Sequence, residues 1–179
     1  MKDEARPKVV IARRVRSVGF EWTPLRRALA VLLEDHGARG TLSVAVVGDP
    51  EIALLHERFL GLRGPTDVLA FPLGEGAGAS SSEGVFGEVV VSAETAAREA
   101  ARRGLRPERE LALYAIHGAL HLVGYDDRTE ATRRRMRGAE RKYLETWAGF
   151  SGERCGLGRA RPLRRRARKD VGFRGRRRA

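Results

Sequence analysis

Apolar positions recur along the chain with two spacings, one typical of strands and one typical of helices. Short apolar runs rich in β-branched residues, such as TLSVAVVG, predict strands at 8–13, 41–48, 67–72 and 88–93. Apolar residues three or four positions apart predict helices at 23–37, 50–61, 94–104, 107–123 and 128–148. Thr23 is the expected N-cap of the first helix, with Pro24 in its first turn. The order predicts an α+β fold, in which several helices pack against one small mixed β-sheet.

The predicted helix at 107–123 differs from the others because it is apolar on more than one face. No charged side chain lies between Glu110 and Asp126, and a helix that is apolar nearly all round is a buried one. We therefore expect a buried central helix. It carries His117 and His121, which stand four residues apart and so project from the same face. Two buried imidazoles one turn apart need polar partners, and a shared metal ion is one such partner.

The residues after the second histidine strengthen the hypothesis of a metal site. Gly124 is expected to be the left-handed residue that ends the helix, so that the chain reverses and brings Asp126 and Asp127 toward the helix end. Two neutral nitrogens and one carboxylate suit Zn²⁺ with one coordination position left open. The alternative is that Asp126 or Asp127 caps the next helix, beginning near Arg128, and both can hold if one aspartate takes each role. The usual helix zinc motif has a glutamate after its first histidine as general base, and that position is Gly118 here.

The net charge of +12 is unevenly distributed along the 179 residues. Residues 151–179 hold 12 Arg and Lys against 2 Asp and Glu, which leaves residues 1–150 nearly neutral. We therefore expect a folded domain over 1–150 and a basic, disordered tail over 151–179. Such a tail binds polyanions such as RNA, with Arg164, Arg165 and Arg166 as candidate contacts. The alternative is a tail that serves only solubility.

Cysteine content and hydropathy bear on the cellular compartment. Cys155 is the only cysteine, which excludes an intramolecular disulfide and fits a reducing cytoplasm. The first ten residues include acidic side chains and lack a long apolar run, so they do not predict a secretory signal. No apolar segment reaches the length of a membrane span. We expect a cytoplasmic protein without a membrane partner.

Residues 117–127, HGALHLVGYDD, resemble the signature H-G-x-L-H-L-x-G-Y-D-H of the YbeY family, bacterial endoribonucleases of ribosomal RNA maturation. Ten of the eleven positions fit. Upstream, GPTDVLAFP at 64–72 is similar to the family's P-T-D-V-L-S-F-P segment, and GEVVVS at 87–92 is similar to its G-D-I-x-I-S strand. The three segments keep the family's order and spacing, and the resemblance covers roughly residues 8–148.

The resemblance implies an α+β fold with a single zinc ion held by three side chains, at the positions of His117, His121 and Asp127. It also implies a single-strand-specific, metal-dependent endoribonuclease. Its role would lie in 16S rRNA 3′-end maturation and ribosome quality control, with small-subunit rRNA and ribosomal particles as partners.

Two positions depart from the family pattern. The family's third metal-binding histidine is Asp127 here. A carboxylate oxygen also binds zinc, but it broadens the choice toward harder ions such as Mn²⁺. The family's arginine before the P-T-D segment, within an L-N-x-x-Y-R pattern, falls on Leu60, and the asparagine falls on His56. Arg58 and Arg63 are the neighbouring candidates for contact with RNA phosphates, and the arginines of the predicted last helix are further candidates.

Three functions are compatible with these residues. The first is a metal-dependent endoribonuclease, and the second is a non-catalytic ribosome-assembly factor with a structural zinc and an rRNA-binding tail. The third is a metallohydrolase of another substrate such as a peptide, against which the missing glutamate after His117 argues. For a nuclease, Asp126 is the candidate general base or a partner that orients a metal ligand, and the attacking group is either water or the ribose 2′-hydroxyl. Thr66 and Asp67 belong either to the site or only to a turn before the strand.

Overall fold

The computed structural model describes residues 6–15, 20–73 and 84–152. Its elements are β1 (Lys8–Arg13), α1 (Trp22–Asp35), β2 (Thr41–Val47), α2 (Asp49–Leu60), β3 (Val68–Pro72), β4 (Val85–Ser92), α3 (Ala93–Arg103), α4 (Pro107–Leu122) and α5 (Glu130–Phe150). Every predicted helix and strand is present in the predicted order, with ends that differ by at most three residues. Among the described residues, no helix is both long and apolar enough to cross a membrane. From residue 153 onward, the predicted tail lies outside the described residues.

The four strands form one mixed sheet in the order β1-β2-β4-β3. β1, β2 and β4 run parallel, whereas β3 pairs antiparallel with β4, with Leu69 opposite Val90. α1 connects β1 to β2, as a parallel pair requires, because its strands cannot be joined by a tight turn. The predicted α+β fold with a small mixed sheet is therefore confirmed.

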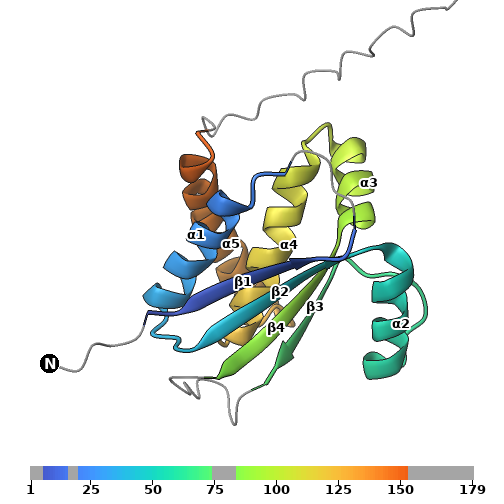
Figure 1. Ribbon diagram of the computed structural model, residues 1–179, viewed down its shortest axis with the longest axis horizontal. Helices are drawn as coiled ribbons and strands as arrows, with labels where there is room; N and C mark the ends of the chain where they lie inside the picture. Colours follow the sequence, from blue (N-terminus) through green and yellow to red (C-terminus); the bar gives the residue numbers. More distant parts are fainter. Residues whose placement is uncertain (1–5, 16–19, 74–83, 153–179) are drawn as a thin grey trace, which may run out of the picture.

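Helices cover the two faces of this sheet unequally (Figure 1). Successive residues of a strand point to opposite faces. In β2, Val44 and Val46 belong to the large core that includes residues of α1, α4 and α5, whereas Ala45 and Val47 belong to a smaller cluster with Ile52 of α2. The side that carries α1, α3, α4 and α5 is thick enough to enclose one of these helices, and that helix is α4.

The start of α1 differs from the prediction in one detail. The helix begins at Trp22 with Glu21 as its N-cap, and no side chain caps it. Thr23 therefore lies inside the first turn, and its prediction as the N-cap is wrong. Pro24 lies in the first turn as predicted, where its missing N–H costs no hydrogen bond.

The start of α5 decides between two roles for the aspartates of the preceding turn. Thr129 is the N-cap: its hydroxyl accepts the amide of Thr132, whose hydroxyl in turn accepts the amide of Thr129. This reciprocal pair satisfies amides that the first helical turn leaves open. The alternative prediction, that Asp126 or Asp127 caps a helix beginning near Arg128, is therefore wrong. Both carboxylates are left for other partners.

α4 is the central helix, and it is buried on nearly all sides as predicted. It contacts β3, β4, α1, α3 and α5. Gly118 sets how closely it packs on the sheet, because a Cβ there would lie 2.6 Å from Cγ1 of Val89 and 3.0 Å from Cγ2 of Val68. The glutamate of the usual helix zinc motif has no room at this position. The residue after His117 therefore serves packing.

Replacing Gly118 by alanine is expected to destabilise the fold by roughly 1–3 kcal/mol, the usual cost of overpacking a core. The obstructing neighbours are stiff β-branched side chains of the sheet, which have little freedom to turn away. Gly138→Ala is the matched control, because nothing lies within 4 Å of a Cβ in the middle of α5. That change should stabilise the helix by up to about 1 kcal/mol. Thermal unfolding of both variants measures the difference, and equal melting temperatures would contradict the close contact.

Candidate metal centre

The end of α4 brings the chain back over its own last turn. The amide of Gly124 donates to the carbonyl of His121 at 3.1 Å, and the amide of Tyr125 donates to that of Leu120 at 2.9 Å. These two bonds form a Schellman motif, which needs a left-handed residue after the cap. Gly124 supplies it with a φ of +95°, as predicted. The reversal directs residues 125–127 toward the histidines.

Each of the two imidazoles is held by a hydrogen bond at Nδ1. The Nδ1–H of His117 donates to Oε1 of Glu140 at 2.7 Å, and that of His121 donates to the carbonyl of Tyr125 at 3.0 Å. Because both partners are oxygens that only accept, Nδ1 carries the hydrogen in both rings. The free lone pairs are then on the two Nε2 atoms, which face each other at 2.9 Å.

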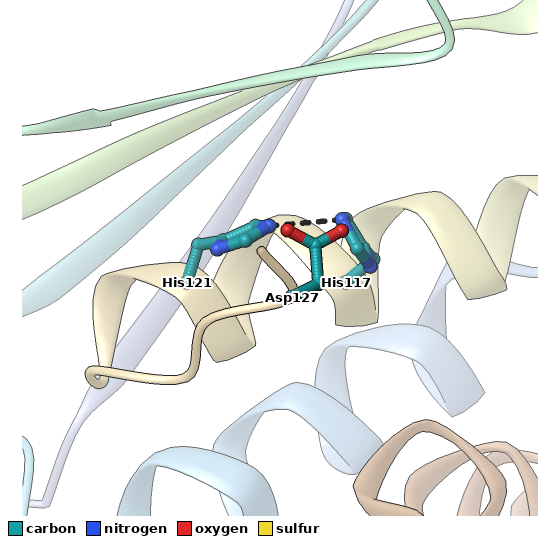
Figure 2. A group of neighbouring side chains, drawn as sticks. All are labelled: His117, His121 and Asp127. Carbon is teal, nitrogen blue, oxygen red and sulfur yellow. Dashed lines mark hydrogen bonds between the residues drawn. The ribbon is translucent and has the colours of Figure 1, made fainter. Parts of the chain in front are cut away.

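Two lone pairs at this distance repel each other unless a proton or a cation lies with them. The carboxylate of Asp127 completes the group, since one ligand atom from each of the three residues lies within 4.8 Å of the others. Figure 2 shows the three side chains facing one another, from α4 and from the turn that follows it. Two neutral imidazoles and one carboxylate are a donor set that zinc accepts. The side chains present therefore fit a divalent cation.

The electrostatics of His117 also favour a positive charge in this position. Burial of the ring lowers its pKa, but the hydrogen bond and charge of Glu140, together with the charges of Asp127 and Asp67, raise the pKa of His117 overall. A group with a raised pKa holds its proton to higher pH, and that proton competes with a metal ion for the same nitrogen. Metal affinity should therefore fall as the pH is lowered, beginning above the pKa of an ordinary histidine.

Asp127 and Asp126 point to different partners although they are adjacent. Nε of Arg133 donates to the backbone carbonyl of Asp127 at 3.2 Å and so ties this residue to α5. The carboxylate of Asp126 accepts the amides of Asp127 and Arg128 and pairs with Nε of Arg128 at 3.0 Å. Asp126 does not belong to the group around the histidines. Its role as general base stays a prediction, with its carboxylate occupied by Arg128.

An open cavity of about 470 Å³ adjoins His117. Thr66 and Asp67 line it, together with Thr95, Arg103, Tyr114 and Glu140. Oδ1 of Asp67 accepts the hydroxyl of Thr66 and the amide of Val68, so the pair also forms the turn before β3. The two roles left open for Thr66 and Asp67, turn and site wall, are thus compatible.

Arg103 is a cation of this cavity that sequence reasoning did not single out. Its Nη1 lies 3.2 Å from Oε2 of Glu110, a fully buried carboxylate, and its Nη2 lies 3.6 Å from Glu99. The cavity therefore has a guanidinium in its wall, fixed by acidic partners. Nothing in the local pattern around Arg103 could indicate this, because it follows another arginine on an exposed helix end.

The other predicted contacts for RNA lie elsewhere. Arg58 stacks over the ring of Phe59, with 5.6 Å to its centroid. Arg63 pairs with Glu57 at 3.4 Å and is 92% exposed. Neither is among the residues that line the cavity beside His117. Arg164, Arg165 and Arg166 lie outside the described residues.

Glu140 is the residue of this centre that the sequence did not reveal. It lies 23 positions from His117 and reaches it only because α5 packs against α4. A carboxylate behind a metal-binding histidine fixes the ring and raises its basicity. Glu140 is the carboxylate that plays this part here.

Glu140→Gln is expected to weaken metal binding by about 10–100-fold, because the amide retains the shape but loses the charge behind His117. Glu145→Gln is the matched control: it removes the same charge from the exposed side of the same helix. Titration of the metal-free variants with zinc against a competing chelator measures both affinities. Equal zinc affinities for the two variants would show that Glu140 has only a packing role.

Comparison with known proteins places this geometry in a family. The sequence model described as Endoribonuclease YbeY matches residues 23–148, which include every residue of the metal centre. The chain belongs to the YbeY family. The resemblance of HGALHLVGYDD to the YbeY signature is thereby confirmed at the level of family membership.

YbeY relatives from several bacteria match the chain over different lengths. A protein named Endoribonuclease YbeY from Geobacter sulfurreducens is 37% identical over 141 residues, which cover 75% of this chain and 92% of that protein. One of the same name from Bifidobacterium longum is 42% identical over 109 residues, covering 59% of this chain. The chain spans about 60% of the length of the Bifidobacterium relatives that it matches. A Thermotoga maritima protein whose structure was determined in solution is 29% identical, with a TM-score of 0.59 over 80% of this chain and 92% of that one.

Proposed function

We propose that the protein is a zinc-dependent endoribonuclease that cleaves single-stranded RNA. The single observation that carries the proposal is the convergence of two oriented Nε2 atoms and the Asp127 carboxylate beside an open cavity. Membership of the YbeY family, whose relatives are named endoribonucleases, supports RNA as the substrate. The family resemblance further suggests a role in 16S rRNA 3′-end maturation and ribosome quality control, in the cytoplasm and on ribosomal particles.

His117, His121 and Asp127 would hold the metal. A divalent cation in this position supplies Lewis-acid activation of a phosphodiester group and of its attacking nucleophile. The protein itself orients the ligands: Glu140 and the Tyr125 carbonyl fix the two rings, and Arg133 fixes the backbone of Asp127. Fixed ligands lose no energy in reorganising when substrate binds.

The cavity beside His117 would hold the nucleotide next to the scissile bond. The hydroxyl oxygen of Thr66 can accept a hydrogen bond from a ribose hydroxyl, and Arg103 offers a guanidinium to a phosphate, so a ribose and a phosphate both find partners there. Tyr114 remains a neutral phenol at physiological pH, because burial and then the charge of Glu110 raise its pKa to about 12. It therefore presents a hydrogen-bond donor and does not repel phosphate.

The test is cleavage of a labelled single-stranded RNA by the zinc-loaded protein, with the same RNA annealed to its complement as a second substrate. We expect endonucleolytic products from the single strand, few from the duplex, and none after removal of the metal with a chelator. Restoring zinc should restore cleavage, and Mn²⁺ is a useful second ion because of the carboxylate ligand. Binding of RNA without cleavage by fully loaded protein would favour the assembly-factor function instead.

Removing the basic tail is expected to weaken RNA binding without removing activity. Residues 151–179 carry +10 of the net charge of +12, whereas every residue of the metal centre precedes residue 141. A chain ending at Phe150 should keep its metal, its melting temperature and its cleavage rate at saturating RNA. Its affinity should depend less steeply on salt, since each phosphate contact contributes about 0.7 to the slope of log affinity against log salt. Equal slopes for both chains would leave the tail without this role.

A further inference from the structure

Two adjoining cavities lie at the turn between α4 and α5, on a different side of α5 from Glu140. One has a volume of about 390 Å³ and the other about 320 Å³. Both are lined by His36, Tyr125 and Arg135. Arg135 and Glu140 are five residues apart on a helix and so project about 140° from each other. The double cavity is therefore separate from the cavity beside His117, with which it shares no lining residue.

The acidic groups of the double cavity are each matched by a basic partner. Asp35 accepts from Nζ of Lys142 at 2.7 Å and from the hydroxyl of Tyr143 at 3.0 Å. The hydrogen bond from Lys142 lowers the pKa of Asp35, so this pair is charged on both sides and nearly neutral as a whole. Asp126 is matched in the same way by Arg128. Neither carboxylate is left to repel an anion.

Among the described residues that line the double cavity, Arg135 is the charged one without an ion-pair partner. Within the part of the chain that the structure describes, it makes no hydrogen bond and no ion pair, whereas its neighbour Arg134 pairs with Glu130 at 3.4 Å. A guanidinium presents a planar fork of donors that matches phosphate oxygens two at a time. An unpaired guanidinium in the wall of two cavities is suited to an anion of this shape.

Tyr125 supplies a second donor. His36 donates from Nδ1 to the carbonyl of Leu32 at 2.8 Å, so its Nε2 accepts the hydroxyl of Tyr125. At 3.3 Å this bond is long for an O–H donor, and the hydroxyl can turn to a better acceptor at small cost. The carbonyl of the same tyrosine holds His121. One residue thus borders the double cavity and orients a candidate metal ligand.

We propose that the double cavity binds a phosphate group of the RNA chain, through Arg135 and the hydroxyl of Tyr125. The inference rests on the proposed function, because it takes RNA as the substrate. A phosphodiester held there is a second anchor for a strand that also reaches the metal centre. Since Tyr125 contacts both sites, a strand bound at both also fixes the turn that carries Asp127.

The test uses the full-length, metal-free protein and follows the amide resonances of Gly124 and Gly138, which line the two cavities. The probes are a short single-stranded RNA, adenosine monophosphate and inorganic phosphate. Site-specific resonances separate this binding from contacts of the basic tail. We expect the RNA to shift both glycines and to bind more tightly than the two small probes. Equal affinity for all three would assign the site to free phosphate.

Arg135→Ala should weaken the binding reported by these two glycines about tenfold, the usual effect of losing a hydrogen bond to a charged group. Arg134→Ala is the matched control, because it removes the same charge from the preceding residue of the helix. It should change the affinity less than about twofold. Tyr125→Phe keeps the ring and should produce an intermediate loss. Melting temperatures of the three variants identify any that fold poorly.

Two results would overturn the inference: unchanged glycine resonances with all three probes, or equal losses for Arg135→Ala and Arg134→Ala. The second would mean that only the diffuse charge of α5 attracts RNA. Because no metal is present, these outcomes do not depend on cleavage. Conversely, if the protein binds phosphate at Arg135 but does not cleave RNA when loaded with zinc, the proposed nuclease activity is wrong and the phosphate site stands.

Discussion

Substituting alanine for both His117 and His121 is expected to leave the protein without bound zinc and to lower RNA cleavage at least about a thousandfold. The two imidazoles are the only nitrogen ligands of the described group, and one carboxylate does not hold zinc alone at micromolar concentrations. The loss in rate corresponds to several kcal/mol of electrostatic stabilisation that the cation supplies. The measurements are metal content after dialysis and single-turnover cleavage of a labelled RNA.

The histidine variants also measure how much the bound metal stabilises the fold. His117→Ala should lower the melting temperature of the zinc-loaded protein toward that of the metal-free wild type, because binding to the folded state alone is what stabilises it. His56→Ala is the matched control: its Nδ1 bonds the carbonyl of Gly64, away from the metal centre. It should keep its zinc and most of its cleavage rate. Full zinc occupancy in the variant that lacks both histidines would contradict the assignment of His117 and His121 as ligands.

Asp127→Ala is expected to weaken zinc binding by about a hundredfold or more, whereas changes at Asp126 should have a much smaller effect. Zinc sites with a complete ligand set bind with about 10–16 kcal/mol, so each ligand accounts for several kcal/mol. Asp127→His should retain zinc, because it restores the histidine of the YbeY signature at this position. The affinity series is measured by competition with a chelator of known affinity.

Asp126→Asn is the control for this series, since an amide oxygen still accepts the backbone amides of Asp127 and Arg128 and keeps the shape of the turn. Asp126→Ala would disturb the turn and so confuse the two roles. If Asp126→Asn lowers zinc affinity more than Asp127→Asn, the carboxylates have been assigned the wrong way round. If Asp126→Asn lowers only the cleavage rate, the prediction of a general base gains its first support.

The carboxylate ligand also changes which metal ions the centre binds. With Asp127, two neutral nitrogens and one anion surround the metal, and the anion of Glu140 lies directly behind His117. The carboxylates add negative charge to the site. This charge favours binding of the cation and lowers the net positive charge of the metal together with its ligands. We therefore expect the Asp127→His variant to prefer zinc over Mn²⁺ more strongly than the wild-type protein does.

The sequence by itself determined the secondary structure and the position of the histidine pair. Periods of 2 and 3.6 residues are local properties of a chain, and the apolar runs here follow them closely enough to locate every described helix and strand. The spacing of His117 and His121 places them on one helix face whatever the helix packs against. Gly124 likewise predicts a left-handed residue at the end of the helix, because few other residue types adopt that backbone conformation. These features depend on neighbours within one or two turns.

Only the tertiary structure decided which partners surround that pair. Glu140 and Arg133 reach the centre from α5, and His36 meets Tyr125 across 89 positions of sequence. These contacts depend on the angle and register at which α5 and α1 pack against α4. No short-range pattern encodes that register, because many arrangements of the helices bury the same apolar stripes. The different roles of the adjacent residues Asp126 and Asp127 were likewise decided by the tertiary structure. Thr129 caps α5, so neither carboxylate does. Arg128 then pairs with the carboxylate of Asp126, whereas Arg133 binds the backbone carbonyl of Asp127, whose carboxylate lies beside the histidines.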